Sequence, residues 1–245
     1  MSASDKRRGL ILPGIVALMA FATLIALGTW QLERKAWKEA LIETLTLRLA
    51  ATPVDLPSVE NWGELTPENS EFRRVKVRLE FLDVYDVYVY SSGSTLRDDI
   101  KSPGYFVFAP ARLPEGRLVV INRGFMPASR DYPGSVRPTE LIGYLRWPEP
   151  QHWFLSDHDA SGDIWIVRDQ RTMAKERRWG EVAPFYIDQE SPVPPVGLPR
   201  PAPLKPNLPN NHLQYALIWY VLATVLVVVF TLWIRGHWRA TAIED

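Results

Sequence analysis

The sequence predicts an α+β membrane protein in which two transmembrane helices, N- and C-terminal, flank a β-rich antiparallel extracytoplasmic domain. Three observations predict this fold class: an uncharged apolar run near each end of the chain, repeated strand-like alternation between them, and a proline-rich stretch before the second run. The expected parts are a cytoplasmic tail (1–9), a transmembrane helix (10–30), the domain with a helical stalk (31–190), a proline-rich linker (191–209), a transmembrane helix (210–234) and a cytoplasmic tail (235–245).

The composition excludes several classes of protein. The 245 residues contain 28 basic and 28 acidic side chains, so no basic surface indicates a nucleic-acid partner. The chain has no cysteine, which excludes disulfides, thiolate metal sites and a cysteine nucleophile.

Each apolar run is long enough to cross a bilayer. Residues 10–30 and 213–234 carry no charge, and about 20 apolar residues span the hydrocarbon layer as a helix. The first run has an alternative interpretation as a cleaved secretory signal, with "KRR" at 6–8 and "AFA" at 20–22. Its continuation to Leu27 and Trp30 favours an uncleaved anchor in contact with membrane lipid.

Basic flanks predict the orientation of the chain. Residues 6–8 precede the first run, and Arg235 and Arg239 follow the second. Positive residues remain on the cytoplasmic side, which places both termini inside and the main domain in the periplasm. Basic residues within 34–38 argue the opposite, but long translocated domains largely escape this rule. The N-terminus lacks an Arg- and Ser-rich transit peptide, which favours a multi-pass protein of the bacterial inner membrane.

The helical stalk is predicted from the spacing of side chains in residues 30–50. Trp30, Arg34, Trp37 and Leu41 share one helical face, and prolines at 53 and 57 end the helix. Strand-like alternation is expected in seven later segments, and residues 169–180 are expected to form a helix that stops at a glycine. The strands are 72–82, 84–93, 104–113, 116–127, 137–148, 163–169 and 184–190. They predict one antiparallel sheet curled toward a barrel or sandwich.

The motifs of common enzymes are absent. The sequence has no G-x-S-x-G, H-E-x-x-H, phosphate loop or G-x-G-x-x-G, so a hydrolase or nucleotide enzyme of a common kind is not expected. The stretch "HWFLSDHDASGD" (152–163) is rich in potential metal ligands, but neighbouring side chains of an extended chain point apart, and a polar turn is the simpler interpretation. Arg123 could bind a carboxylate or haem propionate, although its residue type favours an ion pair at a sheet end.

His212 is the strongest candidate for a site residue. Asparagines at 210 and 211 are suited to cap a helix, so His212 is expected in its first turn. Trp219 lies two turns further, nearly in line with His212, with the small Ala216 between them and Tyr215 beside them. Because haem iron binds a neutral imidazole nitrogen, His212 is a candidate metal ligand, with Tyr215 and Trp219 in contact with the cofactor. The alternative is an aromatic belt at the membrane interface with a polar cap.

Four stretches resemble the surfeit locus protein 1 family: "LGTWQLERKAWKEALI" (27–42), "GYFVFAPARLPEGRLVVINRGFMP" (104–127), "GYLRWPE" (143–149) and "NNHLQYALIWYVLA" (210–223). The resemblance implies a non-enzymatic assembly factor for cytochrome c oxidase that helps place haem a into subunit I. Its implied partners are that subunit and, as a second candidate, haem a synthase. The alternative is a membrane scaffold that stabilises an oxidase assembly intermediate without binding haem.

The resemblance also implies roles for individual residues. The family's N-H-x-x-Y-A histidine, a proposed haem ligand, matches His212, and its tyrosine and tryptophan match Tyr215 and Trp219. Two positions depart from the family pattern, Ile218 where threonine is usual and Phe125 where tryptophan is common. The first departure removes a hydroxyl near the ring. On this interpretation Trp30 closes the pocket from the first span, and Arg34 or Arg123 meets the propionates.

Overall fold

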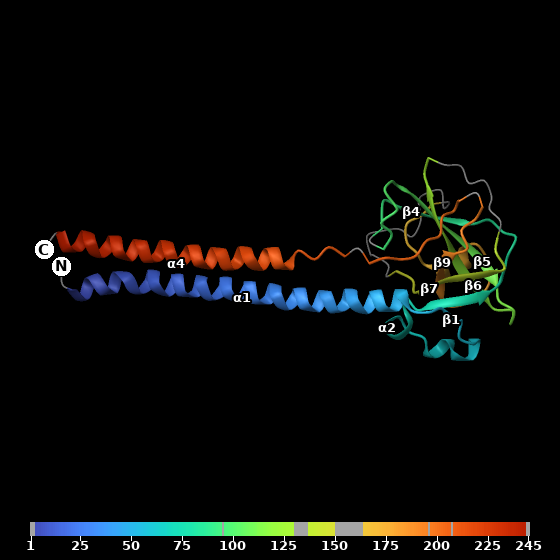
Figure 1. The fold of residues 1–245 in the computed structure, drawn as a ribbon, viewed down its shortest axis with the longest axis horizontal. Helices are drawn as coiled ribbons and strands as arrows, with labels where there is room; N and C mark the ends of the chain where they lie inside the picture. The colour runs from blue at the N-terminus through green and yellow to red at the C-terminus, as the bar shows by residue number, and fades with distance from the viewer. Residues whose placement is uncertain are drawn as a thin grey trace. The chain divides into compact units, whose positions relative to one another are not determined.

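The computed structural model describes residues 3–94, 96–129, 137–149, 164–195, 197–206 and 208–243. The chain forms two compact units (Figure 1). One is a helical pair made of residues 1–42 and 209–245, and the other is a domain made of residues 43–208.

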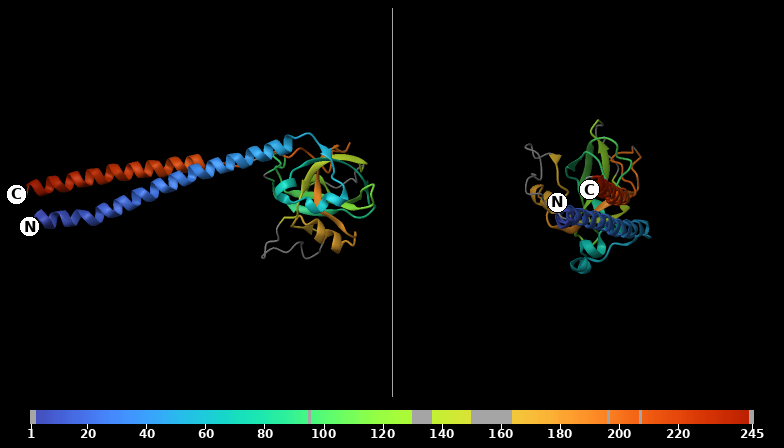
Figure 2. Two further views of the ribbon diagram at one scale, coloured as in Figure 1. Left: turned by 90° about the horizontal axis from the view of Figure 1, so that it is seen from below. Right: turned by 90° about the vertical axis from the view of Figure 1, so that its left-hand side faces the viewer.

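Two long helices form the first unit. Helix α1 runs over Ala3–Ala50 and α4 over His212–Ile243. They lie side by side and antiparallel in both Figure 1 and Figure 2, so α1 begins where α4 ends. The uninterrupted course of α1 to Ala50 confirms the predicted helical stalk.

Both helices are long and apolar enough to cross a membrane, judged by length and composition. The candidate spans are Leu10–Ala50 and His212–Arg239, each with a mean hydropathy of 2.5. The apolar windows are 0% and 6% buried, whereas the core helix of a soluble domain buries its apolar face. Within the described residues, the two helices therefore present bare apolar surface, as lipid-facing helices do.

Polar side chains inside these helices are satisfied locally. The hydroxyls of Thr23, Thr29, Thr224 and Thr231 donate to the carbonyl four residues earlier, at 2.7–3.0 Å. Such bonds remove the cost of an unpaired hydroxyl in an apolar medium.

A mixed nine-stranded sheet forms the second unit. Its strands are β1 Val54–Asp55, β2 Arg74–Arg78, β3 Glu80–Phe81, β4 Val87–Ser91, β5 Gly104–Arg112, β6 Leu118–Pro127, β7 Glu140–Arg146, β8 Ile164–Trp165 and β9 Val182–Ser191. Three short helices accompany them: η1 Val59–Glu64, α2 Pro67–Ser70 and α3 Gln170–Glu176. All seven predicted strand segments and the helix within 169–180 are present.

The prediction of an antiparallel sheet is wrong in part. The sheet order is β1-β2-β7-β9-β6-β5-β4-β8, with β3 on β5, and the pairs β1–β2, β4–β8 and β6–β9 are parallel. The parallel pair at the centre arises because β9 returns after α3 and inserts between β6 and β7. Both β6 and β9 are buried on both faces, as strands enclosed within a sheet are.

The sheet closes on itself where the chain passes from β2 into β3. β2 pairs with β7, and β3, which starts two residues after β2 ends, pairs with β5. The enclosed side chains come from all the strands of this ring and from η1, which supplies Trp62. The sheet therefore forms a barrel, which is one of the two arrangements, barrel or sandwich, that the alternation predicted. A second apolar cluster is formed by residues of β4, β5, β6, β8, β9 and α3, and it includes Trp165, Met173 and Tyr186.

The proline-rich segment after β9 packs onto the domain. Arg200 and Phe125 exchange backbone hydrogen bonds of 2.8 and 3.0 Å, and Leu204 is buried. Gly124 permits this close approach, because it has φ +119° and a Cβ there would lie 2.3 Å from the Arg200 carbonyl.

Candidate functional site

The first residue of α4 is His212, as the asparagines before it predicted. The backbone N–H of Tyr215 donates to the Asn211 carbonyl at 3.2 Å, which makes Asn211 the cap residue of the helix. Just before it, Lys38 Nζ of α1 donates to the Pro209 carbonyl at 2.5 Å. The start of α4 is thus tied to α1.

His212 faces α1 and pairs with Gln31. The ring atom Nδ1 lies 2.7 Å from Gln31 Oε1, and both side chains are half-buried. An amide oxygen can only accept, so Nδ1 carries the proton and donates. Nε2 of the neutral ring then keeps its lone pair, and it makes no hydrogen bond within the described part of the chain.

Small residues bring the helices together below this pair. A Cβ on Gly28 would lie 2.6 Å from the Tyr220 ring, and Thr29 Oγ1 lies 3.3 Å from the Tyr220 hydroxyl oxygen. Ala216 and Ala223 are each 1% exposed. Small side chains at helix contacts allow the backbones to approach closely, as in many membrane helix pairs.

On each helix, one series of half-buried and buried positions recurs every three or four residues, the spacing of coiled-coil packing. These positions are Gly14, Ala17, Phe21, Leu24, Gly28, Gln31, Lys35 and Lys38 on α1, and His212, Ala216, Trp219, Ala223, Leu226 and Phe230 on α4. The contact is apolar up to Gly28 and polar from Gln31 onward, so His212 stands where the contact changes from apolar to polar. An apolar groove of about 400 Å³ lies farther along, between residues 14–21 and 226–231.

The structure places the other predicted site residues differently. Trp219 is half-buried on the same side of α4 as His212, and its Nε1 is buried with no acceptor among the described residues. Tyr215 and Trp30 are each 52% exposed. Trp30 therefore does not close over His212, and the next residue, Gln31, makes the contact with the ring.

The two arginines considered for propionates lie in other surroundings. Arg123 is 2% exposed, and its Nη1 donates to Asp86 at 3.2 Å inside the domain, which makes it the structural ion pair that its residue type favoured. Arg34 is exposed, with its guanidinium 4.2 Å from the Trp37 ring centroid. Arg123 is thus too deeply buried to reach a propionate.

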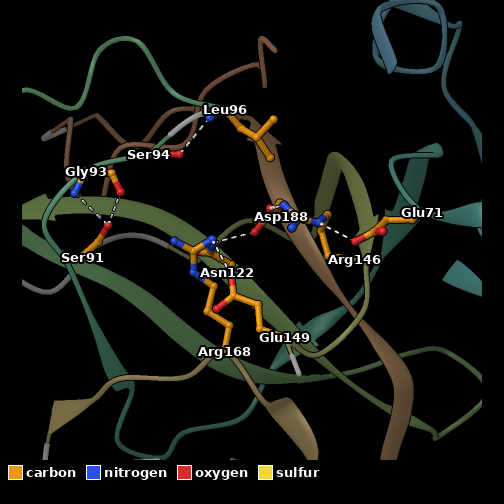
Figure 3. Close-up of polar contacts among 10 residues, drawn as sticks. All are labelled: Glu71, Ser91, Gly93, Ser94, Leu96, Asn122, Arg146, Glu149, Arg168 and Asp188. Atoms are coloured by element: carbon orange, nitrogen blue, oxygen red, sulfur yellow. Dashed lines mark hydrogen bonds and ion pairs between the residues drawn. The ribbon is translucent and has the colours of Figure 1, made fainter. Parts of the chain in front are cut away.

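The domain has its own buried polar cluster, shown in Figure 3. Arg146 of β7 donates to Asp188 of β9 at 3.1 Å and to Glu71 at 3.3 Å. Asn122 of β6 donates to the other Asp188 oxygen at 2.6 Å. The side chains of Asn122, Asp188 and Arg146 lie close together because their strands, β6, β9 and β7, are adjacent in the sheet. Arg168 pairs with Glu149 beside them, at 3.5 Å.

Charge balance explains why this cluster is structural. Burial opposes the charge of Arg146, but Tyr186, Asp188 and Glu71 act in the opposite direction, and the net effect raises its pKa. Burial also raises the pKa of the Tyr186 hydroxyl to about 12. Each arginine of the cluster has a carboxylate partner, so the cluster has no uncompensated cation for an anionic ligand.

No multi-ligand metal centre is present among the residues that the structure describes: no three His, Cys, Asp or Glu side chains converge there. The histidine- and aspartate-rich stretch 152–163 lies outside those residues.

Sequence reasoning missed Gln31 as a site residue. The available signal was its spacing, three residues after Gly28 and four before Lys35. That spacing marks a face, but only the antiparallel alignment of α1 and α4 identifies His212 as the partner.

Comparison with known proteins agrees with this architecture. The model of the SURF1 family matches residues 18–224. Surfeit locus protein 1 of Homo sapiens is 30% identical over 246 residues, which cover 92% of this chain and 78% of the relative. The corresponding protein of Rattus norvegicus is 29% identical over 238 residues, covering 90% and 74%. The SURF1-like protein of the bacterium Rickettsia bellii is 25% identical over 238 residues, covering 91% and 90%. Because the family match runs from within α1 through the sheet into α4, the chain belongs to the SURF1 family.

Proposed function

We propose that the protein is an assembly factor for cytochrome c oxidase, which holds haem a through His212 while the haem is delivered to subunit I. The observation that carries the proposal is the 2.7 Å contact between His212 Nδ1 and Gln31 Oε1. With Nδ1 donating to Gln31, Nε2 is the nitrogen that carries the lone pair of the neutral imidazole, at the start of the helix proposed to span the membrane. Neutral imidazole is the donor that haem iron takes from histidine.

The surroundings of His212 fit a haem as cargo. Trp219 lies two turns below the imidazole on the same side of α4, and its buried Nε1 has no acceptor among the residues that the structure describes. Buried donors are normally paired, so a polar substituent of the cargo would satisfy this one. Tyr215, exposed beside them, would flank the edge of the macrocycle.

Basic side chains suit the carboxylates of such a cargo. Lys35 and Lys38 follow Gln31 on the same face of α1 and are half-buried. Lys35 pairs with Glu39 at 2.7 Å, an exchangeable surface contact of low strength. In the proposal, these two lysines replace Arg34 and Arg123 as the partners of propionates.

The proposed location is the bacterial inner membrane, with both termini in the cytoplasm and the β-rich domain in the periplasm. The basic residues at 6–8, 235 and 239 support it, and His212 then lies at the outer face. The domain would dock on oxidase subunit I or on haem a synthase.

The test is to express the full chain in cells that make haem a, purify it in detergent and record its visible spectrum. The wild type is expected to show a Soret band and His212→Ala to lose it at equal yield. His237→Ala is the matched control, because His237 lies on the same helix and stacks on Trp233 instead. An equal band in His212→Ala would refute the role of His212. A colourless wild type would refute haem binding and favour the scaffold alternative.

A further inference from the structure

We infer that Gln31 is a positioning residue that fixes the tautomer and the orientation of the His212 ring, so that Nε2 is the nitrogen offered to iron. The inference rests on the proposed function and adds a residue of the other helix to its site. The contact between α1 and α4 is then part of the haem-binding site.

The contact between the two side chains is held on both sides. Three residues before Gln31, Gly28 packs against the Tyr220 ring. Seven residues after it, Lys38 donates to the carbonyl of Pro209. The contacts on either side of Gln31 along α1 therefore fix the register of the two helices. This register keeps the amide oxygen of Gln31 within hydrogen-bond distance of the imidazole.

The chemistry follows from the number of protons on the ring. A neutral imidazole carries one proton, and an acceptor beside Nδ1 holds it there. In this tautomer Nε2 presents its lone pair. A hydrogen bond at the far nitrogen also orients the ring and raises its basicity as a metal ligand, and loss of such partners typically lowers metal affinity by about 10–100-fold.

A purely structural role is the competing explanation. Hydrogen bonds between membrane helices also stabilise the association of those helices, so this one could serve only to join α1 and α4. A structural bond would affect the stability of the helix pair but would not determine which ring nitrogen carries the proton, and measurement of the tautomer separates the two roles.

The experiment is ¹⁵N NMR of the haem-free full chain in detergent micelles, with labelled histidine. The chain has four histidines, and the His212 signals are assigned by their loss in His212→Ala. The wild type is expected to carry its proton at Nδ1. Gln31→Leu is expected to shift the population toward Nε2–H, and Gln31→Glu, which keeps an acceptor, to retain Nδ1–H. Gln214→Leu, at an exposed position two residues after His212, is the control and should leave the tautomer unchanged.

Haem titration of the same variants completes the test. Gln31→Leu is expected to bind haem a about 10–100-fold more weakly than the wild type, and Gln31→Glu to bind it and to lower its reduction potential. If Gln31→Leu left both tautomer and affinity unchanged while His212→Ala lost the haem, the role of Gln31 would be overturned and the proposed function would stand. A wild type that binds no haem would overturn both. Should Gln31→Leu fail to express, the tautomer of the wild type and the potential of Gln31→Glu still decide the question, because an Nε2–H wild type or an unshifted potential would refute the inference.

Discussion

Replacement of Asp188 by alanine tests whether the buried polar cluster holds the domain together. The Asp188 carboxylate is the shared acceptor of Arg146 and Asn122, at 3.1 and 2.6 Å. The side chains of Asp188 and Arg146 are each 9% exposed. Without Asp188, the guanidinium would keep only Glu71, at 3.3 Å.

The size of the effect follows from this burial. Removing one partner of a buried ion pair costs about 3–5 kcal/mol of the free energy of unfolding, and the remaining contact with Glu71 places the expected loss at the lower end of that range. In a domain of this size, each kcal/mol lowers Tm by about 2–4 °C, so Asp188→Ala is expected to melt roughly 10 °C below the wild type.

The assay is thermal unfolding of the full chain in detergent, followed by tryptophan fluorescence. Glu140→Ala is the matched control, because Glu140 also contacts two basic residues, Lys76 and Arg78, at 3.0 and 3.2 Å, but on the surface. Exposed ion pairs contribute about 0–1 kcal/mol, so the control should melt within about 3 °C of the wild type. Equal melting temperatures for the two variants would refute the view that the cluster is structural.

Three further predictions concern the helix pair, the pH dependence of stability and the topology. Gly28→Leu should separate the helices and abolish haem binding, whereas Gly14→Leu, where a Cβ meets nothing within 4 Å, should retain it; equal haem content would contradict the close contact. The pKa of Tyr186 is raised from 10.0 to about 12, so its contribution of about 3 kcal/mol is complete below pH 10 and is lost as the pH rises to 12. Denaturant unfolding of wild type and Tyr186→Phe over this range should show the difference, and parallel curves would refute it. In intact cells, an impermeant maleimide should label a cysteine placed at Tyr85, which is 90% exposed, but not one placed at Asp245, and the reverse pattern would invert the proposed topology.

Sequence patterns predicted the strands well because burial leaves a direct imprint on them. The alternation in "VKVRL" matches β2, where Val75 and Val77 point into the barrel between charged residues. Elements without such a pattern were not predicted, namely β1, η1 and α2, which have 2, 6 and 4 residues. Their placement depends on what they pack against; η1, for example, supplies Trp62 to the barrel.

Parallel pairing could not be predicted because it depends on how the chain returns to the sheet. The antiparallel interpretation assumed that successive strands are neighbours. β9 instead inserts between β6 and β7 after α3 has covered the second apolar cluster. The available signal was the apolar run that opens each strand, "LVVI" in β6 and "VAPFYI" in β9, since such runs are typical of enclosed strands.

The candidate site was predictable only in its local part. Capping asparagines and helical spacing predicted His212 in the first turn of α4 and Trp219 nearly in line with it, and the structure has His212 as the first residue of that helix. The face of α1 that meets them was not predicted: the aromatic face with Trp30 and Trp37 is exposed, and the neighbouring face with Gln31 forms the contact. Helical periodicity shows which residues share a face, but the alignment of two helices decides which face is used.

The most direct test of the central claim is pulsed EPR of the ferric, haem-loaded protein grown with ¹⁵N-histidine. We predict hyperfine coupling from one histidine nitrogen of the protein, present in His237→Ala and absent in His212→Ala. Coupling that persists in His212→Ala, or iron without a histidine ligand in the wild type, would contradict the assignment of His212 as the haem ligand.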